Sequence, residues 1–356
     1  MTRSSSHGAD PSVLRRLNSA ATLRALRAGG EFTLSALAER VGVSRPTAEG
    51  VLGELTARGL VAEVAPRHGA GLGRPARRYR FRAEAGHVLG LEIDARRVRL
   101  LVADLAGAVA GGHRADLPPD APPAERIAAV RAAVKTGLAA ARVARRSLRA
   151  VAAGTPGVVD PSGTVATCTV VPGWAGVPLG RELARSFACP VLVENDANLA
   201  ALAERWRGAA RDADDVVCVH VGLHTGIGVL IGGRLHRGRG AAGEIGMLPE
   251  LGLRDTAAAL AAEPVGRVAA RMARGVAAMA LALDPETIVV GGPLVRPGGP
   301  LVAELAAHVG PLCLRPVRVE ASPLGDESVS LGAVRLALDR VDEDLFSPDI
   351  SLDAAR

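Results

Sequence analysis

The residues best placed for chemistry lie between positions 191 and 204, where the sequence reads VLVENDAN followed by LAALAE. The first half is an apolar run too short for a helix, and the second half carries apolar residues at helical spacing. This pattern predicts a buried strand, a polar corner and a helix. Asn195 and Asp196 fall at the corner, where ligands of open α/β sheets bind and where a helix dipole favours an anion. For an isolated Asn-Asp pair, the competing interpretation is a simple helix cap.

Several glycine-containing motifs surround this corner in a fixed order. GLHTGIG at 222–228, IGG at 231–233 and GEIG at 243–246 follow it, PGV at 156–158 and GW at 173–174 precede it, and IVVGG at 288–292 comes near the end. Each motif alone is weak, but the ordered set resembles the ROK family of repressors and sugar kinases over residues 88–340. The resemblance implies a two-lobed α/β domain of the actin-like, ribonuclease H-like class.

The resemblance also implies roles for individual residues. Asp196 matches the base that takes a proton from a sugar hydroxyl, while Asn195 and Glu244 match residues that hold the sugar. The loop that leads to Trp174 matches the part of the family's cleft that faces Asn195. Trp174 could stack on a sugar face, or it could pack between the lobes as a core residue. We therefore expect an effector pocket formed by Asn195, Asp196, Glu244, Gly157 and Trp174.

Two departures from the family's pattern argue against catalysis. The kinases carry Asp-x-Gly-Gly-Thr after the first strand, because glycine lets the backbone approach the ATP phosphates closely; this chain has DARR at 94–97. After GEIG, the family's histidine and cysteine-rich zinc run are replaced by Met247 and the aliphatic stretch 248–253, which cannot form a tetrahedral zinc site. We therefore expect no metal, no cofactor and no enzymatic activity, with Asp196 as a vestigial base. An anion held by the arginines of the 94–97 turn is the alternative use of that turn.

Charge is unevenly distributed along the chain. Residues 1–82 contain fourteen arginines and six acidic residues, a net charge of +8, whereas the whole chain carries +6 and the remainder therefore −2. A basic excess confined to one segment indicates an anionic partner for it, and DNA is favoured over a membrane because the segment has no basic helix with a broad apolar face. Apolar spacing predicts helices at 13–27, 33–40 and 44–58 and strands at 60–64 and 78–81. This order, with Gly42 in the turn, is typical of a winged helix-turn-helix.

The third helix of such a domain enters the major groove with its first turn leading. Ser44 would cap this helix. Arg45, Thr47 and Glu49 point away from the apolar inner stripe, so they are the candidates for contact with base edges. Glu49 would be repelled by phosphate unless it faced a cytosine amino group.

The loop between the two strands is the second candidate DNA contact. Its Gly-Arg-Pro turn would carry Arg74 into a narrow minor groove, and Arg77 and Arg78 would follow the phosphates. The same loop resembles the repressor branch of the ROK family, whose kinases lack this domain.

These patterns predict a sequence of domains. We expect a winged helix-turn-helix at 1–82, a linker at 83–87, a first lobe at 88–197, a second lobe at 198–340 whose closing helix could return to the first, and an acidic tail at 341–356. Expected strands lie at 88–94, 98–104, 109–114, 148–153, 216–221, 228–231, 286–290 and 317–320, and expected helices at 124–144, at 256–283 with a break at Pro264, and at 328–338. No apolar run reaches the ~20 residues of a membrane span, and the polar N-terminus has no signal-peptide core, so we expect a soluble, cytoplasmic protein.

Taken together, the sequence predicts a DNA-binding transcription regulator, a repressor, whose kinase-like domain senses a sugar or sugar-derived effector and joins two or four copies on a double-stranded operator. Two alternatives stay open. The first is an ATP-dependent sugar kinase, supported by Asp196 and by Thr225-Gly226, which match the second phosphate contact of the family. The second is a regulator without a ligand, in which the domain only dimerises.

Overall fold

The computed structural model describes residues 11–64 and 77–346. Contacts divide them into two compact units, each of which is described by itself. The first unit comprises the residues up to His87, residues 104–108 and the residues from Asp339 onward, and the second comprises residues 88–103 and 109–338.

The first unit is a winged helix-turn-helix, as predicted. Its elements, in chain order, are α1 (Pro11–Gly29), β1 (Glu31–Thr33), α2 (Leu34–Val41), α3 (Arg45–Ala57), β2 (Val61–Val64), β3 (Arg78–Phe81) and the short 3-10 helix η1 (Ala83–Ala85). Thr33 caps α2, and Gly42 ends it with a left-handed φ of 75°. The three strands form a sheet in the order β1-β3-β2. Strand β1 escaped prediction because three residues are too few to show an alternating pattern.

The four leucines of α1 divide into a buried and an exposed pair. Leu23 and Leu26 are 1% exposed and pack in the core of the unit, whereas Leu14 and Leu17 are 49% and 52% exposed. Nine residues separate Leu14 from Leu23, and Leu17 from Leu26, so the two pairs lie on opposite faces of the helix. Periodicity therefore identified the helix correctly and its core residues only in part.

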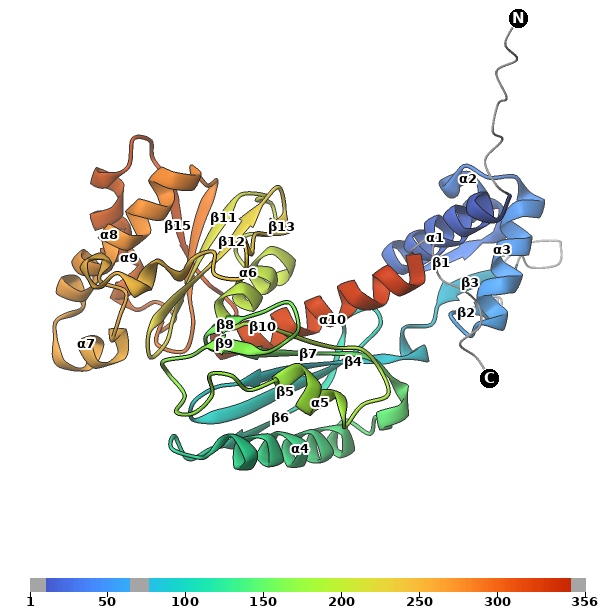
Figure 1. The fold of residues 1–356 in the computed structure, drawn as a ribbon. Coiled ribbons are helices and arrows are strands. Elements are labelled where there is room, and N and C mark those ends of the chain that lie inside the picture. Colours follow the sequence, from blue (N-terminus) through green and yellow to red (C-terminus); the bar gives the residue numbers. More distant parts are fainter. Residues whose placement is uncertain (1–10, 65–76, 347–356) are drawn as a thin grey trace, which may run out of the picture. The chain divides into compact units, whose positions relative to one another are not determined.

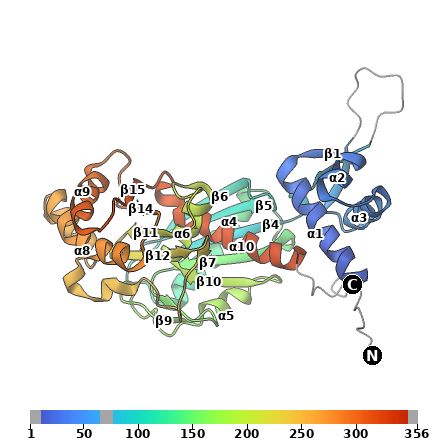
Figure 2. The same ribbon diagram turned by 90° about the horizontal axis from the view of Figure 1, so that it is seen from above.

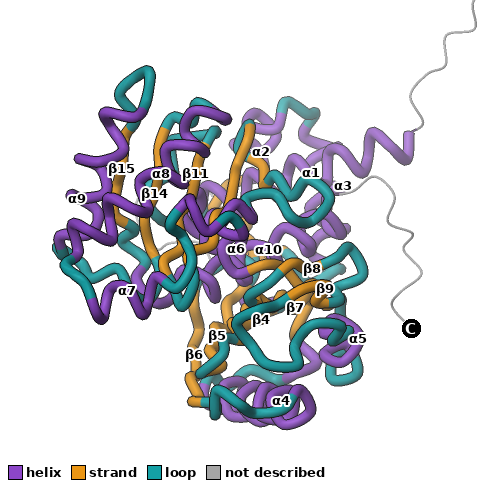
Figure 3. Tube along the Cα trace, turned by 60° about the vertical axis from the view of Figure 1, so that its left-hand side comes forward, coloured by secondary structure: helices purple, strands orange, loops and turns teal. Residues whose placement is uncertain are grey.

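The first lobe of the second unit is built on a five-stranded sheet. Its elements are β4 (His87–Ile93), β5 (Arg97–Asp104), β6 (Val109–Asp116), α4 (Pro123–Ala140), η2 (Arg145–Ser147), β7 (Leu148–Thr155), β8 (Val158–Val159), β9 (Val165–Thr167), α5 (Leu179–Ala184) and β10 (Val191–Asn195). The strand order is β10-β7-β4-β5-β6, and β10 runs parallel to β7. Helix α4 lies against β5 and β6, where Gly137 leaves room for Leu100 (Figure 3).

The second lobe is built on another five-stranded sheet, in the order β13-β12-β11-β14-β15. Its elements are α6 (Asp196–Arg207), β11 (Val216–Val221), β12 (Thr225–Ile231), β13 (Arg234–Leu235), η3 (Glu244–Met247), η4 (Pro249–Leu251), α7 (Thr256–Ala262), α8 (Val265–Leu283), β14 (Thr287–Gly291), α9 (Pro300–Val309), η5 (Gly310–Leu312), β15 (Arg318–Ala321) and η6 (Gly325–Glu327). Helix α10 (Ser328–Phe346) follows in the chain and packs on β4 of the first lobe. Helices α8 and α9 pack on one face of this sheet, as Figures 1 and 2 show. The predicted break at Pro264 separates α7 from α8.

Helix α6 lies between the two sheets, because glycines let both lobes approach its backbone. A Cβ at Gly228 of β12 would stand 2.3 Å from the carbonyl oxygen of Ala197, and one at Gly332 of α10 would stand 1.8 Å from that of Leu199. Neither contact tolerates a side chain. The first turn of α6, which begins at Asp196, is therefore fixed by contacts from both lobes.

The last described helix is longer than predicted. We had predicted that this helix ends at 338 and that an acidic tail begins at 341. Helix α10 instead continues to Phe346, so residues 341–346 are helical. Residues 347–356 lie outside the described residues. Its first half packs against β4, where a Cβ at Gly90 would meet the carbonyl oxygen of Ser330 at 2.4 Å. None of the helices in the described ranges has the length and apolarity needed to cross a membrane.

Candidate ligand pocket and nucleic-acid interface

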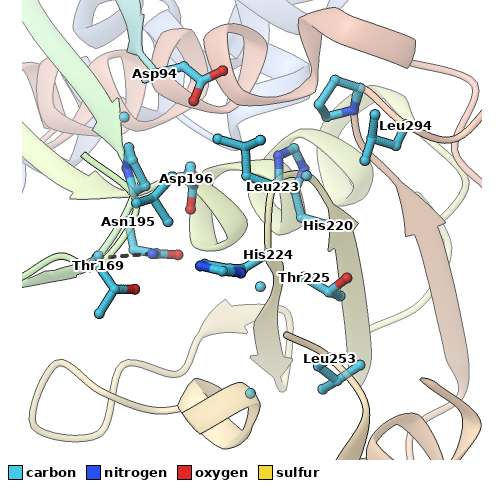
Figure 4. Close-up of a pocket in the computed structure, with 18 of the residues that line it drawn as sticks. Asp94, Thr169, Asn195, Asp196, His220, Leu223, His224, Thr225, Leu253 and Leu294 are labelled. Atoms are coloured by element: carbon cyan, nitrogen blue, oxygen red, sulfur yellow. Dashed lines mark hydrogen bonds between the residues drawn. The ribbon is translucent and has the colours of Figure 1, made fainter. Parts of the chain in front are cut away.

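A pocket of about 260 Å³ opens in the second unit, between its two sheets. Its lining comes from the ends of β4, β7, β10 and β11, from the first residue of α6, and from the segments around η3 and the turn after β14 (Figure 4). Parallel strands present their carboxyl ends at one edge of a sheet, so ligands of such sheets bind there. The polar corner, which we define as Asn195 and Asp196, is part of this lining, as are Gly157 and Glu244.

Asn195 joins two parts of the pocket. Its side-chain oxygen accepts a hydrogen bond from Asn198 N at 3.1 Å and so caps α6, and its side-chain nitrogen donates to the carbonyl oxygen of Gly157 at 3.0 Å. Gly157 has a φ of +100°, and a Cβ there would stand 2.2 Å from the carbonyl oxygen of Thr167. Asn195 therefore caps α6 and lines the pocket at the same time.

Asp196, which is half-buried, and His220, which is buried, both line the pocket and interact electrostatically. Burial raises the pKa of the Asp196 carboxyl, and the nearby His220 opposes this shift. Burial lowers the pKa of His220, which is 8% exposed, and the charge of Asp196 raises it. Within the described residues, Nδ1 of His220 is buried without a hydrogen-bond partner. His220 was not among the predicted pocket residues, although a single histidine in the apolar run VVCVHV was the available signal.

Glu244 faces the same pocket from η3. Burial is the main cause that raises the pKa of its carboxyl, and the charge of Asp196 adds to the effect. Two acidic groups with raised pKa values, near an amide and an imidazole, provide both donors and acceptors for a ligand with several hydroxyls.

The 94–97 turn on the other side of the pocket is filled by protein groups. Ala95 is 3% exposed and belongs to the core of the first lobe. Arg126 of α4 is fully buried and donates hydrogen bonds to the carbonyl oxygens of Asp94 and Ala95, at 2.8 and 3.0 Å. Two backbone N–H groups of the turn are also bonded within it: Asp94 N donates to the carbonyl oxygen of Arg97 at 2.9 Å, and Ala95 N donates to the Asp94 carboxylate at 2.6 Å. These N–H groups are therefore not free for a phosphate.

Ion pairs extend from this turn into the sheet. Glu92 lies 3.7 Å from Arg97 and 3.6 Å from Arg99, and Arg99 donates to Asp326 at 2.8 Å. Burial nevertheless raises the pKa of Glu92 to about 7, because the two arginines only partly offset the loss of solvation. Arg96 is exposed at the pocket edge.

We had predicted that Trp174 is part of the effector pocket, and this prediction was wrong. It is fully buried and belongs to the core of the first lobe, and it does not line the cavity. Its indole N–H donates to the Thr155 hydroxyl at 2.7 Å, and the Arg126 guanidinium lies 5.8 Å from its ring. A tryptophan whose N–H and ring face are both used inside the core cannot stack on a sugar in this structure, so the core interpretation of Trp174 is the correct one.

The segment after η3 packs its leucine inward. Leu253 is fully buried in the core of the second lobe against α8, where a Cβ at Gly275 would stand 2.7 Å from a Leu253 methyl group. Thr225, the expected phosphate contact of a kinase, shares a 2.8 Å hydrogen bond with the hydroxyl of Thr256. His224 Nδ1 accepts a hydrogen bond from Asp255 N at 3.0 Å. The groups that would face a nucleotide phosphate are thus already bonded within the lobe.

In the first unit, α3 presents the predicted recognition residues to solvent. The Ser44 hydroxyl accepts a hydrogen bond from Thr47 N at 3.3 Å and lies 2.8 Å from the Thr47 hydroxyl, which confirms the cap. Arg45, Thr47 and Glu49 are exposed, and the buried face of the helix is formed by Ala48, Val51, Leu52 and Leu55.

The wing is described only at its base. Arg74 lies outside the described residues. Arg77 is exposed, 3.4 Å from Glu63, whereas Arg78 lies 3.2 Å from Glu31 and donates to its carbonyl oxygen at 3.3 Å. Of these two, Arg77 is the more available for a phosphate, because its side chain and that of Glu63 beside it are both exposed, at 63% and 47%.

Comparison with known proteins identifies both units. Residues 88–250 match the model of the ROK family, and residues 18–65 match that of the IclR helix-turn-helix domain. The xylose repressor of Caldicellulosiruptor bescii is 23% identical over 236 residues, which are 66% of this chain and 59% of that protein. The chain thus matches less than two thirds of the repressor's own length.

Solved structures agree with this assignment. A ROK family transcriptional regulator, a homologue of the E. coli MLC protein, superposes with a TM-score of 0.69 over 94% of this chain and 99% of that one, at 18% identity, which shows a common fold. A ROK glucokinase from Streptomyces griseus, solved with glucose and AMPPNP, gives a TM-score of 0.59 at 25% identity and covers 71% of this chain and all of the kinase.

Proposed function

We propose that this chain, whose residues 88–250 match the ROK family model and whose residues 18–65 match a helix-turn-helix model, is a DNA-binding transcription regulator, a repressor. Its kinase-like domain senses an effector without catalysing a reaction. One observation carries the proposal: a basic winged helix-turn-helix with exposed Arg45, Thr47 and Glu49 precedes a domain whose 94–97 turn is filled by Arg126. The first feature binds DNA, and the second has no role in phosphoryl transfer.

The DNA contacts follow from the exposure of the first turn of α3. Arg45 can pair with a guanine in two hydrogen bonds, and Thr47 and Glu49 can reach neighbouring bases. Arg74, Arg77 and Arg78 would add contacts from the wing, with Arg78 the weakest because of its contacts with Glu31. A single winged domain makes few base contacts, so we propose a homodimer or homotetramer that reads repeated half-sites.

The effector is a sugar or a sugar derivative. Asn195, Asp196 and Glu244 supply the donors and acceptors that hydroxyl groups need, and Gly157 closes the pocket beside them. The similarity to a xylose repressor and to a glucokinase solved with glucose supports this class of ligand.

A sugar kinase is the second candidate, and Asp196 is the observation that favours it. Phosphoryl transfer depends mostly on positioning the phosphoryl group and stabilising its charge, and general-base help alone contributes only ~10²–10⁴-fold. Arg96 and Arg97 stand where the kinase pattern has its two glycines, and the Thr225 hydroxyl is bonded to Thr256. We therefore propose that Asp196 accepts a hydrogen bond from an effector hydroxyl.

The decisive test measures binding of the full-length protein to its operator, which genomic selection would identify. Arg45→Ala should cost roughly 1–3 kcal/mol at the cognate site if Arg45 reads a guanine, and affinity should fall steeply with salt. Arg58→Ala is the matched control, because it removes the same charge from the exposed far end of the same helix. Equal losses in the two variants would reduce the role of Arg45 to charge alone, and no loss in either would remove the recognition surface.

A further inference from the structure

The lining of the pocket in the second unit is of two chemical kinds. The polar corner and Glu244 supply its polar groups. Leu223, Met247 and Leu294 also line the cavity, and their side chains are 37%, 58% and 36% exposed. Apolar side chains with this exposure are normal when they are scattered singly over a surface. Three that face one cavity form an apolar wall, which marks a place where a ligand buries apolar surface.

Backbone hydrogen bonds hold this apolar wall in place. Leu294 N donates to the carbonyl oxygen of Val221 at 3.2 Å, which ties the turn after β14 to the end of β11. Ala257 N donates to the carbonyl oxygen of Leu223 at 3.4 Å. Leu253, fully buried, supports the wall from the core side, and Figure 4 shows Leu223, Leu253 and Leu294 around the cavity. A wall fixed in this way loses little conformational freedom when a ligand binds.

Resting on the proposed effector role of this pocket, we propose that its ligand is a sugar that carries an apolar substituent, such as an aryl or alkyl group. The hydroxyls of the ring bind the polar corner and Glu244, and the substituent lies against the apolar wall. The pocket volume of about 260 Å³ is close to the lower end of the ~300–1,000 Å³ that is usual for small-molecule sites. This size favours one ring with a compact substituent over a longer oligosaccharide.

A sugar with an anionic substituent is the competing ligand, because Arg96 and Arg254 also line the pocket. Both arginines are exposed, so solvent already satisfies their charges. An anion placed against leucine and methionine side chains would lose its hydration without compensation. An apolar substituent would cover the exposed side chains of the apolar wall, which otherwise stay in contact with water. It therefore fits this pocket better than an anionic substituent.

The test compares ligands that differ only in the substituent. Calorimetry with the full-length protein would measure the affinities of xylose and glucose, of their methyl and phenyl glycosides in both anomers, of 6-O-benzylglucose and of glucose 6-phosphate. We expect at least one aryl derivative to bind roughly tenfold or more tightly than the corresponding free sugar. Leu294→Ser should remove this gain and leave the affinity for the free sugar unchanged. Leu281→Ser, a change of an equally apolar and 53% exposed leucine on α8 that does not line the pocket, should leave both unchanged.

Other results would overturn the proposal in distinguishable ways. If a free sugar binds and no aryl derivative gains affinity, or if only the phosphate gains, the effector role stands and the apolar substituent fails. If Leu294→Ser weakens the free sugar and its aryl derivative equally, the apolar wall serves closure of the lobes and not a substituent. If no member of the series binds, the proposed effector site fails together with this inference.

Discussion

The two sides of the pocket, the polar corner and the 94–97 turn, differ in the groups that they present to the cavity. At the corner, Asp196 keeps a carboxylate that faces the cavity, next to an asparagine cap. At the turn, every feature closes the space: Ala95 fills it, and Arg126 occupies the carbonyls of Asp94 and Ala95. A site for a sugar needs only hydrogen-bonding groups at a strand end, whereas a site for phosphates needs bare backbone, so the second is lost as soon as side chains appear there.

Of the changes that would test the difference between the two sides of the pocket, replacement of Arg126 should have the largest effect. Arg126→Met removes the guanidinium and leaves buried carbonyl oxygens without donors, so we expect the free energy of unfolding to fall by about 3–5 kcal/mol. Chemical denaturation would measure this loss. Arg131→Met on the same helix changes a largely solvated arginine near Glu182 and should cost about 0–1 kcal/mol. Similar costs for the two variants would mean that the turn does not depend on Arg126.

The pH dependence of stability tests the charges beside the turn. Glu92 has a folded pKa of about 7, above the unfolded value, so the folded state binds the extra proton between these values and stability falls as pH rises through 7. We expect this group to remove about 2–3 kcal/mol between pH 5 and pH 8. Thermal unfolding of the wild type and Glu92→Gln across this range would show the slope in the first and its loss in the second. A slope of the same size in Glu92→Gln would assign the effect to other groups.

Asp196→Asn addresses the opposite side of the pocket. The loss of a charged acceptor should weaken effector binding by about 2 kcal/mol, and stability should change little, because Asn195 still caps α6. Calorimetry with the sugar series and denaturation of the free protein would separate the two effects. The reverse outcome, in which stability is lost and sugar affinity is kept, would make Asp196 a structural residue only.

The smallest expected effect is the most informative about the turn. The double change Arg96→Gly and Arg97→Gly restores the two glycines of the kinase pattern. The N–H groups of Asp94 and Ala95 still donate to acceptors within the turn, so we expect no ATP-dependent sugar phosphate from either the wild type or the variant. A coupled assay with purified protein would detect it. Activity gained in the variant, and lost again on Asp196→Asn, would show that only two side chains separate this domain from a kinase.

Local patterns predicted the parts of the molecule that local physics decides. The strand, corner and helix around Asp196, the cap at Ser44 and the break at Pro264 each depend on residues within a few positions of one another. The short elements β1, α5 and α9 lacked such a pattern, because tertiary packing or only a few residues define them.

The direction of a side chain was harder to predict than its place in the chain. Trp174 points into the core, and Arg126 reaches across from α4 to the 94–97 turn. His220 lies beside Asp196 only because β11 and α6 pack together. These contacts join residues that are far apart in the sequence, so no spacing could reveal them.

The packing of α10 on β4 has a consequence for biosynthesis. Gly90 and Ser330 come into close contact although 240 positions separate them. The face of the first sheet that α10 covers therefore stays exposed until residue 330 and its neighbours have left the ribosome. The sheet β1-β3-β2, by contrast, closes within residues 31–81. Vectorial synthesis therefore lets the helix-turn-helix sheet assemble early, while the apolar strands of the first lobe wait longest for their last helix and are the segment that most needs protection from aggregation.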